Sequence, residues 1–194
     1  MTAMVDYVQM YNNLPSIEEA DERFTNREAT FAKLAPILAE FNHQFGVCLV
    51  HAHCKLEQGE KMIAQGKITQ PELNTDLVHY PDRWLPNGQP FEFTTKPTTS
   101  PPAKLVNELQ KITGPDGVLG LFYKSDDVKE LEHTEGRKNI MEEVTDLTGT
   151  DHLETAWLPN FDGVTLLAGC TKYCQMSLGA SGTKKHTGHQ GHNP

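Results

Sequence analysis

The sequence predicts an α+β fold, a mostly antiparallel sheet with helices on one face. Three observations carry this prediction. An amphipathic helical stretch begins after residue 15, the apolar runs beyond residue 46 are short and strand-like, and helical patterns recur between those runs. Helices and strands in this order are typical of an antiparallel sheet that is covered on one side.

The first expected helix covers residues 16–43. Ser16 and Glu19 form a capping box, in which a hydroxyl and a carboxylate cap the start of a helix. Pro36 lies within the segment, so we expect a kink or a break there. The apolar side chains recur at helical spacing and share one face: Phe24, Phe31, Leu34, Leu38 and Phe41.

The strongest strand signal follows at residues 47–56. This segment is rich in residues that favour a pleated surface. Because side chains alternate along a strand, His51 and His53 are expected on one face, and Cys48 and Cys54 on the other.

The remaining elements are shorter. Residues 64–102 are rich in proline, so we expect mostly connection there, with one hairpin at Asn87-Gly88, a typical two-residue turn. Four elements are expected beyond it: helices at 103–112 and 138–147, a strand at 118–123, and a hairpin that pairs 152–158 with 164–174 across a five-residue loop.

Composition divides the chain into three parts. Residues 1–15 form a polar N-terminal arm, and residues 16–178 form a single α+β domain. Residues 179–194 form a low-complexity, His-rich tail that we expect to be disordered. The first residues lack the basic start and apolar run of a signal peptide, and no stretch is apolar for long enough to span a membrane.

The net charge of the chain indicates which classes of partner to expect. The chain of 194 residues has 26 acidic and 17 basic residues, which gives a net charge of −9. Nucleic-acid-binding proteins usually carry basic patches, so we expect no nucleic-acid partner, and no membrane partner either.

The four cysteines are few for a secreted disulfide scaffold, so we expect reduced thiols in a cytoplasmic protein. They pack in the core or, where their strands are neighbours, could bind zinc. If the last hairpin pairs symmetrically about its loop, His152 lies opposite Cys170. That pair could act as a base and a nucleophile.

His51 and His53 carry the sharpest chemical signal. On a strand, their side chains leave one face about 6–7 Å apart, near enough to ligate one metal ion. Histidine and carboxylate donors suit Fe(II), Mn(II) or Zn(II), so the expected cofactor is a divalent metal of this kind. The same pair could instead bind a ligand without metal, transfer protons or have only a structural role.

Together with Glu57, these histidines give the pattern H-x-H-x-x-x-E. It resembles the first metal-binding motif of the cupins, a family of β-barrel proteins. The resemblance implies His51, His53 and Glu57 as metal ligands. It covers one short segment, and the family's second motif, a Pro-x-Gly segment before a last histidine, has no counterpart here.

A wider resemblance rests on the segments 45–60, 154–159 and 169–174. They resemble uncharacterised fungal proteins that carry a V-H-x-H strand. The resemblance implies a eukaryotic origin and no particular activity.

Glu154 joins His51 and His53 as a candidate catalytic residue, because it stands close to Trp157 on a sheet with one open face. We therefore expect a small-molecule-binding protein or accessory metabolic enzyme with a site at His51 and His53. The alternative is a non-catalytic protein-interaction module, or a structural domain whose sheet closes a homodimer. Titratable groups that converge on a cavity would favour the first, and a flat apolar patch the second.

Overall fold

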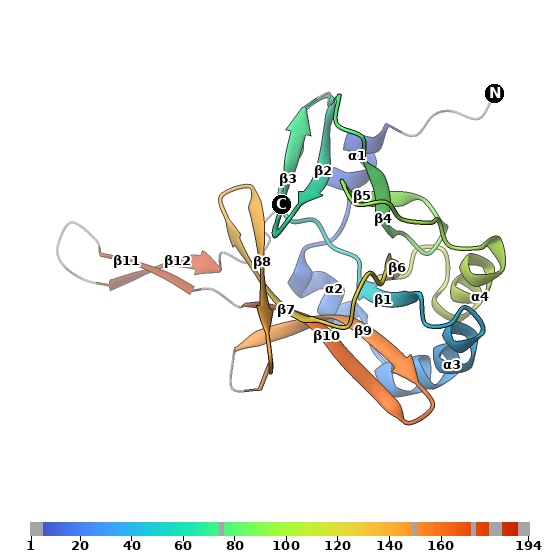
Figure 1. Cartoon of the computed structure of the whole chain (residues 1–194). Coiled ribbons are helices and arrows are strands. Elements are labelled where there is room, and N and C mark those ends of the chain that lie inside the picture. The colour runs from blue at the N-terminus through green and yellow to red at the C-terminus, as the bar shows by residue number, and fades with distance from the viewer. Residues whose placement is uncertain (1–5, 74–75, 149–150, 172–173, 179–183, 190–194) are drawn as a thin grey trace.

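The protein is a closed β-barrel of ten strands (Figure 1). The structure, a computed structural model, describes residues 6–73, 76–148, 151–171, 174–178 and 184–189. The predicted α+β class, with helices on one face of an open sheet, is therefore wrong. The sheet curls until its first and last strands pair, which leaves no open face for a layer of helices.

The barrel strands follow one another around the wall in the order β1-β6-β4-β5-β2-β3-β8-β7-β10-β9, and β9 pairs back with β1. The pairs β2–β5 and β7–β10 are parallel, and the other neighbours are antiparallel. The strands are β1 (Phe45–Leu49), β2 (Glu60–Gln65), β3 (Ile68–Leu73), β4 (Tyr80–Trp84), β5 (Pro90–Thr94), β6 (Leu119–Tyr123), β7 (Lys129–Glu135), β8 (Lys138–Val144), β9 (His152–Asn160) and β10 (Gly163–Thr171).

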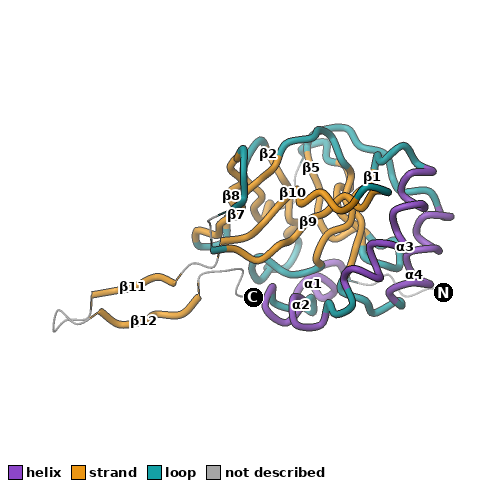
Figure 2. The backbone as a smooth tube through the Cα atoms, turned by 90° about the horizontal axis from the view of Figure 1, so that it is seen from below, coloured by secondary structure: helices purple, strands orange, loops and turns teal. Residues whose placement is uncertain are grey.

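Four helices lie outside this wall (Figure 2): α1 (Tyr7–Asn12), α2 (Ile17–Arg23), α3 (Arg27–Glu40) and α4 (Ala103–Thr113). Helices α2, α3 and α4 cover the outer surface of β1, β6 and β9, where Phe31, Leu38 and Trp157 belong to one apolar core. A second core lies inside the barrel and under α1, around Tyr11, Met62 and Phe91. No helix of the described residues is long and apolar enough to cross a membrane.

The N-terminal helices confirm one expectation and correct another. Ser16 and Glu19 form the predicted capping box at the start of α2. The helical region breaks at residues 24–26 rather than at Pro36, which lies inside α3. Phe24 is the C-cap of α2, and Asn26, with a left-handed φ of 53°, is the N-cap of α3.

Two segments that were expected to be connection or helix form strands. Residues 60–73 make the hairpin β2–β3, and residues 138–144 make β8. Pro71 is tolerated in β3 because that strand pairs with β8 only through Ile68 and Thr69, so no ladder hydrogen bond is lost at the proline. The helix α4 and the strand β6 are confirmed, and so is a hairpin that contains Asn87-Gly88. Its turn is longer than the expected two residues, because the Leu85 N–H donates to the Gln89 carbonyl.

The last barrel hairpin is tighter than expected. Asn160 pairs with Gly163, so the turn has two residues rather than five, and the ladder shifts near Ala168. His152 consequently lies opposite Thr171, and Cys170 lies opposite Leu153.

Beyond the barrel, β11 (Cys174–Leu178) and β12 (Lys184–His189) form a two-stranded antiparallel ribbon. The strand β12 lies within the expected His-rich tail, and residues 179–183 and 190–194 of that tail lie outside the described residues.

Candidate functional site

Charged and polar side chains are buried inside the barrel. The sequence brings them from six segments: His51 and His53 from the loop after β1, and Arg83, Glu92, Glu132, Asn139 and Cys170 from β4, β5, β7, β8 and β10. None of them is more than 9% exposed. Burial of so many charges is costly unless they are paired, so their contacts decide what the interior can do.

Arg83 joins two of these carboxylates. Its Nε lies 3.3 Å from Glu92 Oε2, and its Nη2 lies 3.3 Å from Glu132 Oε1. The other oxygen of Glu92 is 2.8 Å from Nε2 of His53. His53 is fixed in turn, because its backbone N–H donates to the hydroxyl of Tyr11 on helix α1. A chain of contacts therefore runs from α1 across the barrel to β7.

These contacts set the charge states. Although burial opposes ionisation, His53 and Arg83 hold the pKa of Glu92 at about 2. Burial also opposes ionisation of Glu132, yet Arg83 and the neighbouring histidines lower its pKa. Both carboxylates are therefore ionised at neutral pH. Burial, followed by the influence of His53, lowers the pKa of His51 to about 4, so that imidazole is neutral.

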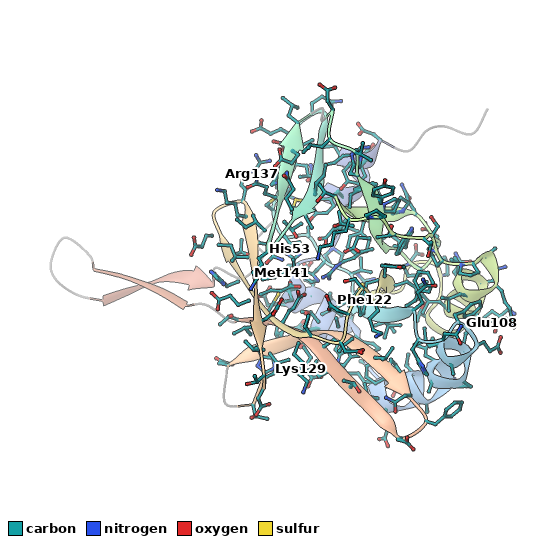
Figure 3. All side chains as sticks on the ribbon, viewed as in Figure 1. His53, Glu108, Phe122, Lys129, Arg137 and Met141 are labelled. Carbon is teal, nitrogen blue, oxygen red and sulfur yellow. The ribbon has the colours of Figure 1, made fainter. Side chains whose placement is uncertain are left out.

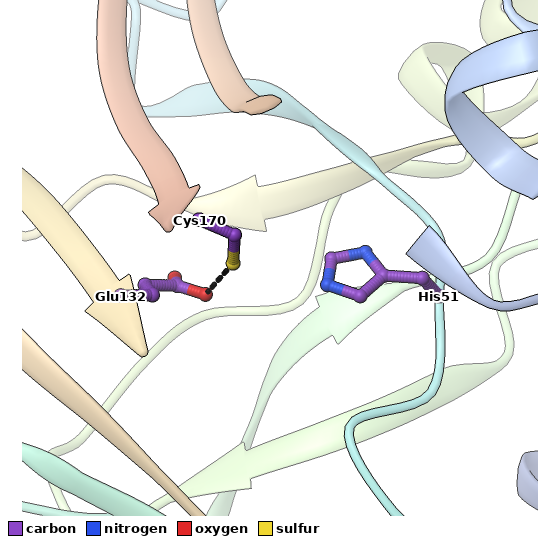
Figure 4. A group of neighbouring side chains, drawn as sticks. All are labelled: His51, Glu132 and Cys170. Atoms are coloured by element: carbon purple, nitrogen blue, oxygen red, sulfur yellow. Dashed lines mark hydrogen bonds between the residues drawn. The ribbon is translucent and has the colours of Figure 1, made fainter. Parts of the chain in front are cut away.

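His51, Glu132 and Cys170 form a compact cluster (Figure 4). Their donor atoms all lie within 4.8 Å of one another. The thiol of Cys170 donates to Glu132 Oε2 at 3.2 Å, and Asn139 Nδ2 donates to the same oxygen at 3.2 Å. Burial and the nearby Glu132 raise the pKa of the Cys170 thiol, so the thiol keeps its proton while no cation is present.

A cavity of about 130 Å³ opens on the other side of Arg83. Its polar lining includes Asp82, Arg83, Thr94 and Glu130. The lining also includes the charged residues Lys96, Lys124 and Asp126. Apolar residues contribute as well, among them Phe122 and Met141, which are labelled in Figure 3. Arg83 is therefore a residue of the cavity lining, and its guanidinium contacts the buried carboxylates.

Two carboxyl groups of the cavity titrate near neutrality. Burial raises the pKa of Asp82 to about 6, against the influence of Arg83. Burial and the neighbouring Glu132 raise the pKa of Glu130 to about 7. Carboxyls with such values can both donate and accept protons at physiological pH.

The structure brings together some of the residues singled out from the sequence. The rings of His51 and His53 lie 4.9 Å apart, but on a loop, because β1 ends at Leu49. Glu57 is exposed, its backbone N–H donates to Glu60, and it is not part of the cluster with His51. Glu154 is also exposed and accepts from the indole of Trp157 at 3.0 Å.

Sequence reasoning missed most of the interior. Arg83, Glu92 and Glu132 lie on strands where charged side chains look like solvent-facing positions. Cys170 was singled out as a partner of His152 and as one of four cysteines that could bind zinc, but not as a partner of His51 or Glu132. One signal was available: β5 alternates between apolar and polar residues around Glu92, and in a closed small barrel one of the two faces of a strand points inward.

Comparison with known proteins adds no family. No protein-family model matches the chain, and no curated protein or solved structure matches it either.

Proposed function

We propose that the protein binds a small polar molecule with an acceptor oxygen in the cavity beside Arg83. The observation that carries this proposal is the position of Arg83. Arg83 is buried, its guanidinium is held by two carboxylates, and the residue lines the cavity. A charged group fixed in this way is preorganised, so a ligand that contacts it loses little energy to reordering of the side chain.

The hydrogen-bond donors of Arg83 indicate the ligand chemistry. A guanidinium has five N–H donors. The contacts with Glu92 and Glu132 use Nε and Nη2, whereas Nη1 makes no hydrogen bond to any residue in the described part of the chain. A carbonyl, carboxylate or hydroxyl oxygen of a ligand would provide the acceptor that Nη1 needs.

The size of the cavity limits the ligand. A cavity of about 150 Å³ accommodates benzene, so about 130 Å³ corresponds to a molecule of roughly six heavy atoms. The mixed lining fits a molecule with an oxygen at one end and a short carbon skeleton. Asp82 and Glu130 add carboxyl groups that can share a proton with that oxygen.

In this proposal His53, which was expected to contact the ligand itself, acts through other residues. His53 positions Glu92, and Glu92 positions Arg83. Titratable groups converge on one side of a cavity, which supports small-molecule binding over a protein-interaction module.

Ligand-observed NMR with a set of small molecules tests the proposal. The set contains short-chain hydroxy acids, keto acids, amides and polyols. Ala64 lines the cavity and is half-buried, so Ala64→Leu should fill its mouth with little strain in the core. Ala39, half-buried on α3 and remote from the cavity, provides the matched control Ala39→Leu.

We expect at least one molecule of the set to bind the unmodified protein and Ala39→Leu equally, and to bind Ala64→Leu at least tenfold more weakly. Binding that Ala64→Leu leaves unchanged, or no binding by any member of the set, would overturn the proposal.

A further inference from the structure

We propose that His51, Glu132 and Cys170 form a binding site for one Zn²⁺ ion inside the barrel. The three residues come from the loop after β1, from β7 and from β10, and the closed barrel brings their donor atoms within 4.8 Å of one another. This set differs from the histidines and Glu57 that the sequence pattern suggested, and it shares only His51 with them.

His51 is oriented for metal binding. Its Nδ1 lies 2.6 Å from the carbonyl oxygen of Leu49. A carbonyl can only accept, so Nδ1 carries the hydrogen and Nε2 carries the lone pair. The ring in Figure 4 directs Nε2 toward Glu132 and Cys170. A backbone acceptor on one ring nitrogen is the usual way in which proteins fix a metal-binding histidine.

Glu132 is held in the same manner. Arg83 contacts Oε1 at 3.3 Å, and Asn139 donates to Oε2 at 3.2 Å. Such outer contacts orient a ligating carboxylate. The side-chain oxygen of Asn139, Oδ1, is buried and accepts no hydrogen bond from the described residues. Buried acceptors are normally paired, so a donor such as a water molecule on the ion is expected beside Glu132.

The donor set selects the metal. Thiolate sulfur with imidazole nitrogen and carboxylate oxygen suits Zn²⁺, whereas Mg²⁺, Ca²⁺ and Mn²⁺ prefer oxygen. Zinc bonds are about 2.3 Å to sulfur and about 2.0–2.2 Å to nitrogen or oxygen. Tetrahedral donors at these lengths lie about 3.3–3.6 Å apart, so any two donor atoms must approach by at most about 1.5 Å. Three protein donors leave a fourth position for water.

Binding exchanges a proton for the ion. The Sγ–H bond of Cys170 breaks, an Sγ–Zn bond forms, and the proton that is now donated to Glu132 passes to bulk water. No oxidation or reduction is involved. Without the ion, a hydrogen bond from the thiol to the carboxylate joins Cys170 and Glu132. The experiment must therefore separate the metal-bound state from this metal-free state.

The experiment uses the full chain with His186, His189 and His192 replaced by Gln, which removes the histidines of the tail. The protein is loaded with Zn²⁺ or Co²⁺, desalted and analysed for metal. Cys170→Ser and His51→Gln are the test variants. Cys48→Ser is the matched control, because Cys48 is an equally buried free thiol outside the cluster. Far-ultraviolet circular dichroism reports whether each variant is folded.

We expect one metal ion per chain in the unmodified background and in Cys48→Ser, and at least a tenfold loss of affinity in both test variants. The Co²⁺ form should show the intense near-ultraviolet absorption of a thiolate–cobalt bond, a readout that needs no variant. Absence of that absorption, or metal retained in Cys170→Ser, would overturn the site. The ligand proposal is tested separately, since Ala64→Leu should still bind the ion.

Discussion

Arg83 and Glu132, 49 positions apart in the chain, meet inside the barrel with 3.3 Å between Nη2 and Oε1. The contact links the two candidate binding regions, because Arg83 lines the cavity and Glu132 belongs to the cluster with His51 and Cys170. The interior is therefore one connected polar network, and its members can be tested one at a time.

Replacement of Arg83 should be the most destabilising change in the network. Arg83→Met leaves Glu92 and Glu132 as buried carboxylates without their cation, which typically costs about 3–5 kcal/mol. Urea denaturation at pH 7 measures this. Arg137→Met is the control, because Arg137 is 44% exposed and pairs with Glu60 at the surface. Equal effects of the two substitutions would contradict a buried role for Arg83.

Asp82 should make stability depend on pH. Its pKa is raised to about 6 in the folded state, so folding favours the protonated form. The contribution to stability is fully present below the unfolded pKa of 3.8 and is lost as pH rises through about 6. Asp82→Asn should therefore stabilise the protein at pH 8, by up to about 3 kcal/mol, and have no effect near pH 3.5.

Melting temperatures measured for the two proteins from pH 3.5 to pH 8 check this prediction. Asp116→Asn, a change at an exposed aspartate outside the cavity, is the control. If the difference in melting temperature between Asp82→Asn and the unmodified protein stays constant across the range, folding does not raise the pKa of Asp82.

The surface pair of Glu60 and Arg137 should give the opposite pH dependence. The hydrogen bonds from Arg137 lower the pKa of Glu60, against the effect of burial. The stabilisation is therefore present above the unfolded pKa of 4.5 and is lost as pH falls through the lower, folded pKa. Because Arg137 is 44% exposed, water screens the pair, and Arg137→Gln should cost no more than about 1 kcal/mol at pH 7.

The same pH series measures this cost, which should disappear at the acid end. Lys104→Gln breaks the exposed pair with Glu40 and serves as the comparison, with no measurable change expected. If Arg137→Gln still lowers stability at acid pH, the loss comes from packing of the arginine side chain and not from its charge.

Tyr11 should stabilise the loop that carries the histidines. Its hydroxyl is buried and accepts the backbone N–H of His53 at 3.1 Å. Tyr11→Phe leaves that N–H without its acceptor, at a cost of about 1–3 kcal/mol. Tyr123→Phe is the control, since among the described residues that hydroxyl has a hydrogen bond only with the exposed Gln44. Chemical denaturation distinguishes them, and equal stabilities would show that the hydroxyl of Tyr11 is dispensable.

Local sequence signals predicted local structure. The capping box at Ser16, the hairpin around Asn87-Gly88 and the apolar face of α4 each depend on neighbours within a few residues, and each was confirmed. The helix expected at 138–147 failed because its apolar spacing fits a helix, whereas pairing with β7 and β3 determined the outcome.

Long-range closure could not be predicted from the same signals. The pairing of β9 with β1 joins segments about a hundred residues apart, and nothing in either strand specifies the partner. Closure of the barrel determines which residues meet in the candidate site. It turns Glu132 and Arg83 inward, whereas an open sheet would have left them in water, and it moves Cys170 to His51 rather than to His152. The importance of His51 was predicted, but its partners were not.

The most direct test of the central claim is a crystal structure of the protein soaked with the tightest-binding small molecule of the NMR set. The account predicts electron density for the molecule in the cavity, with one of its oxygens about 3 Å from Nη1 of Arg83. Density for the molecule outside that cavity, or in the cavity without a contact to Arg83, would contradict it.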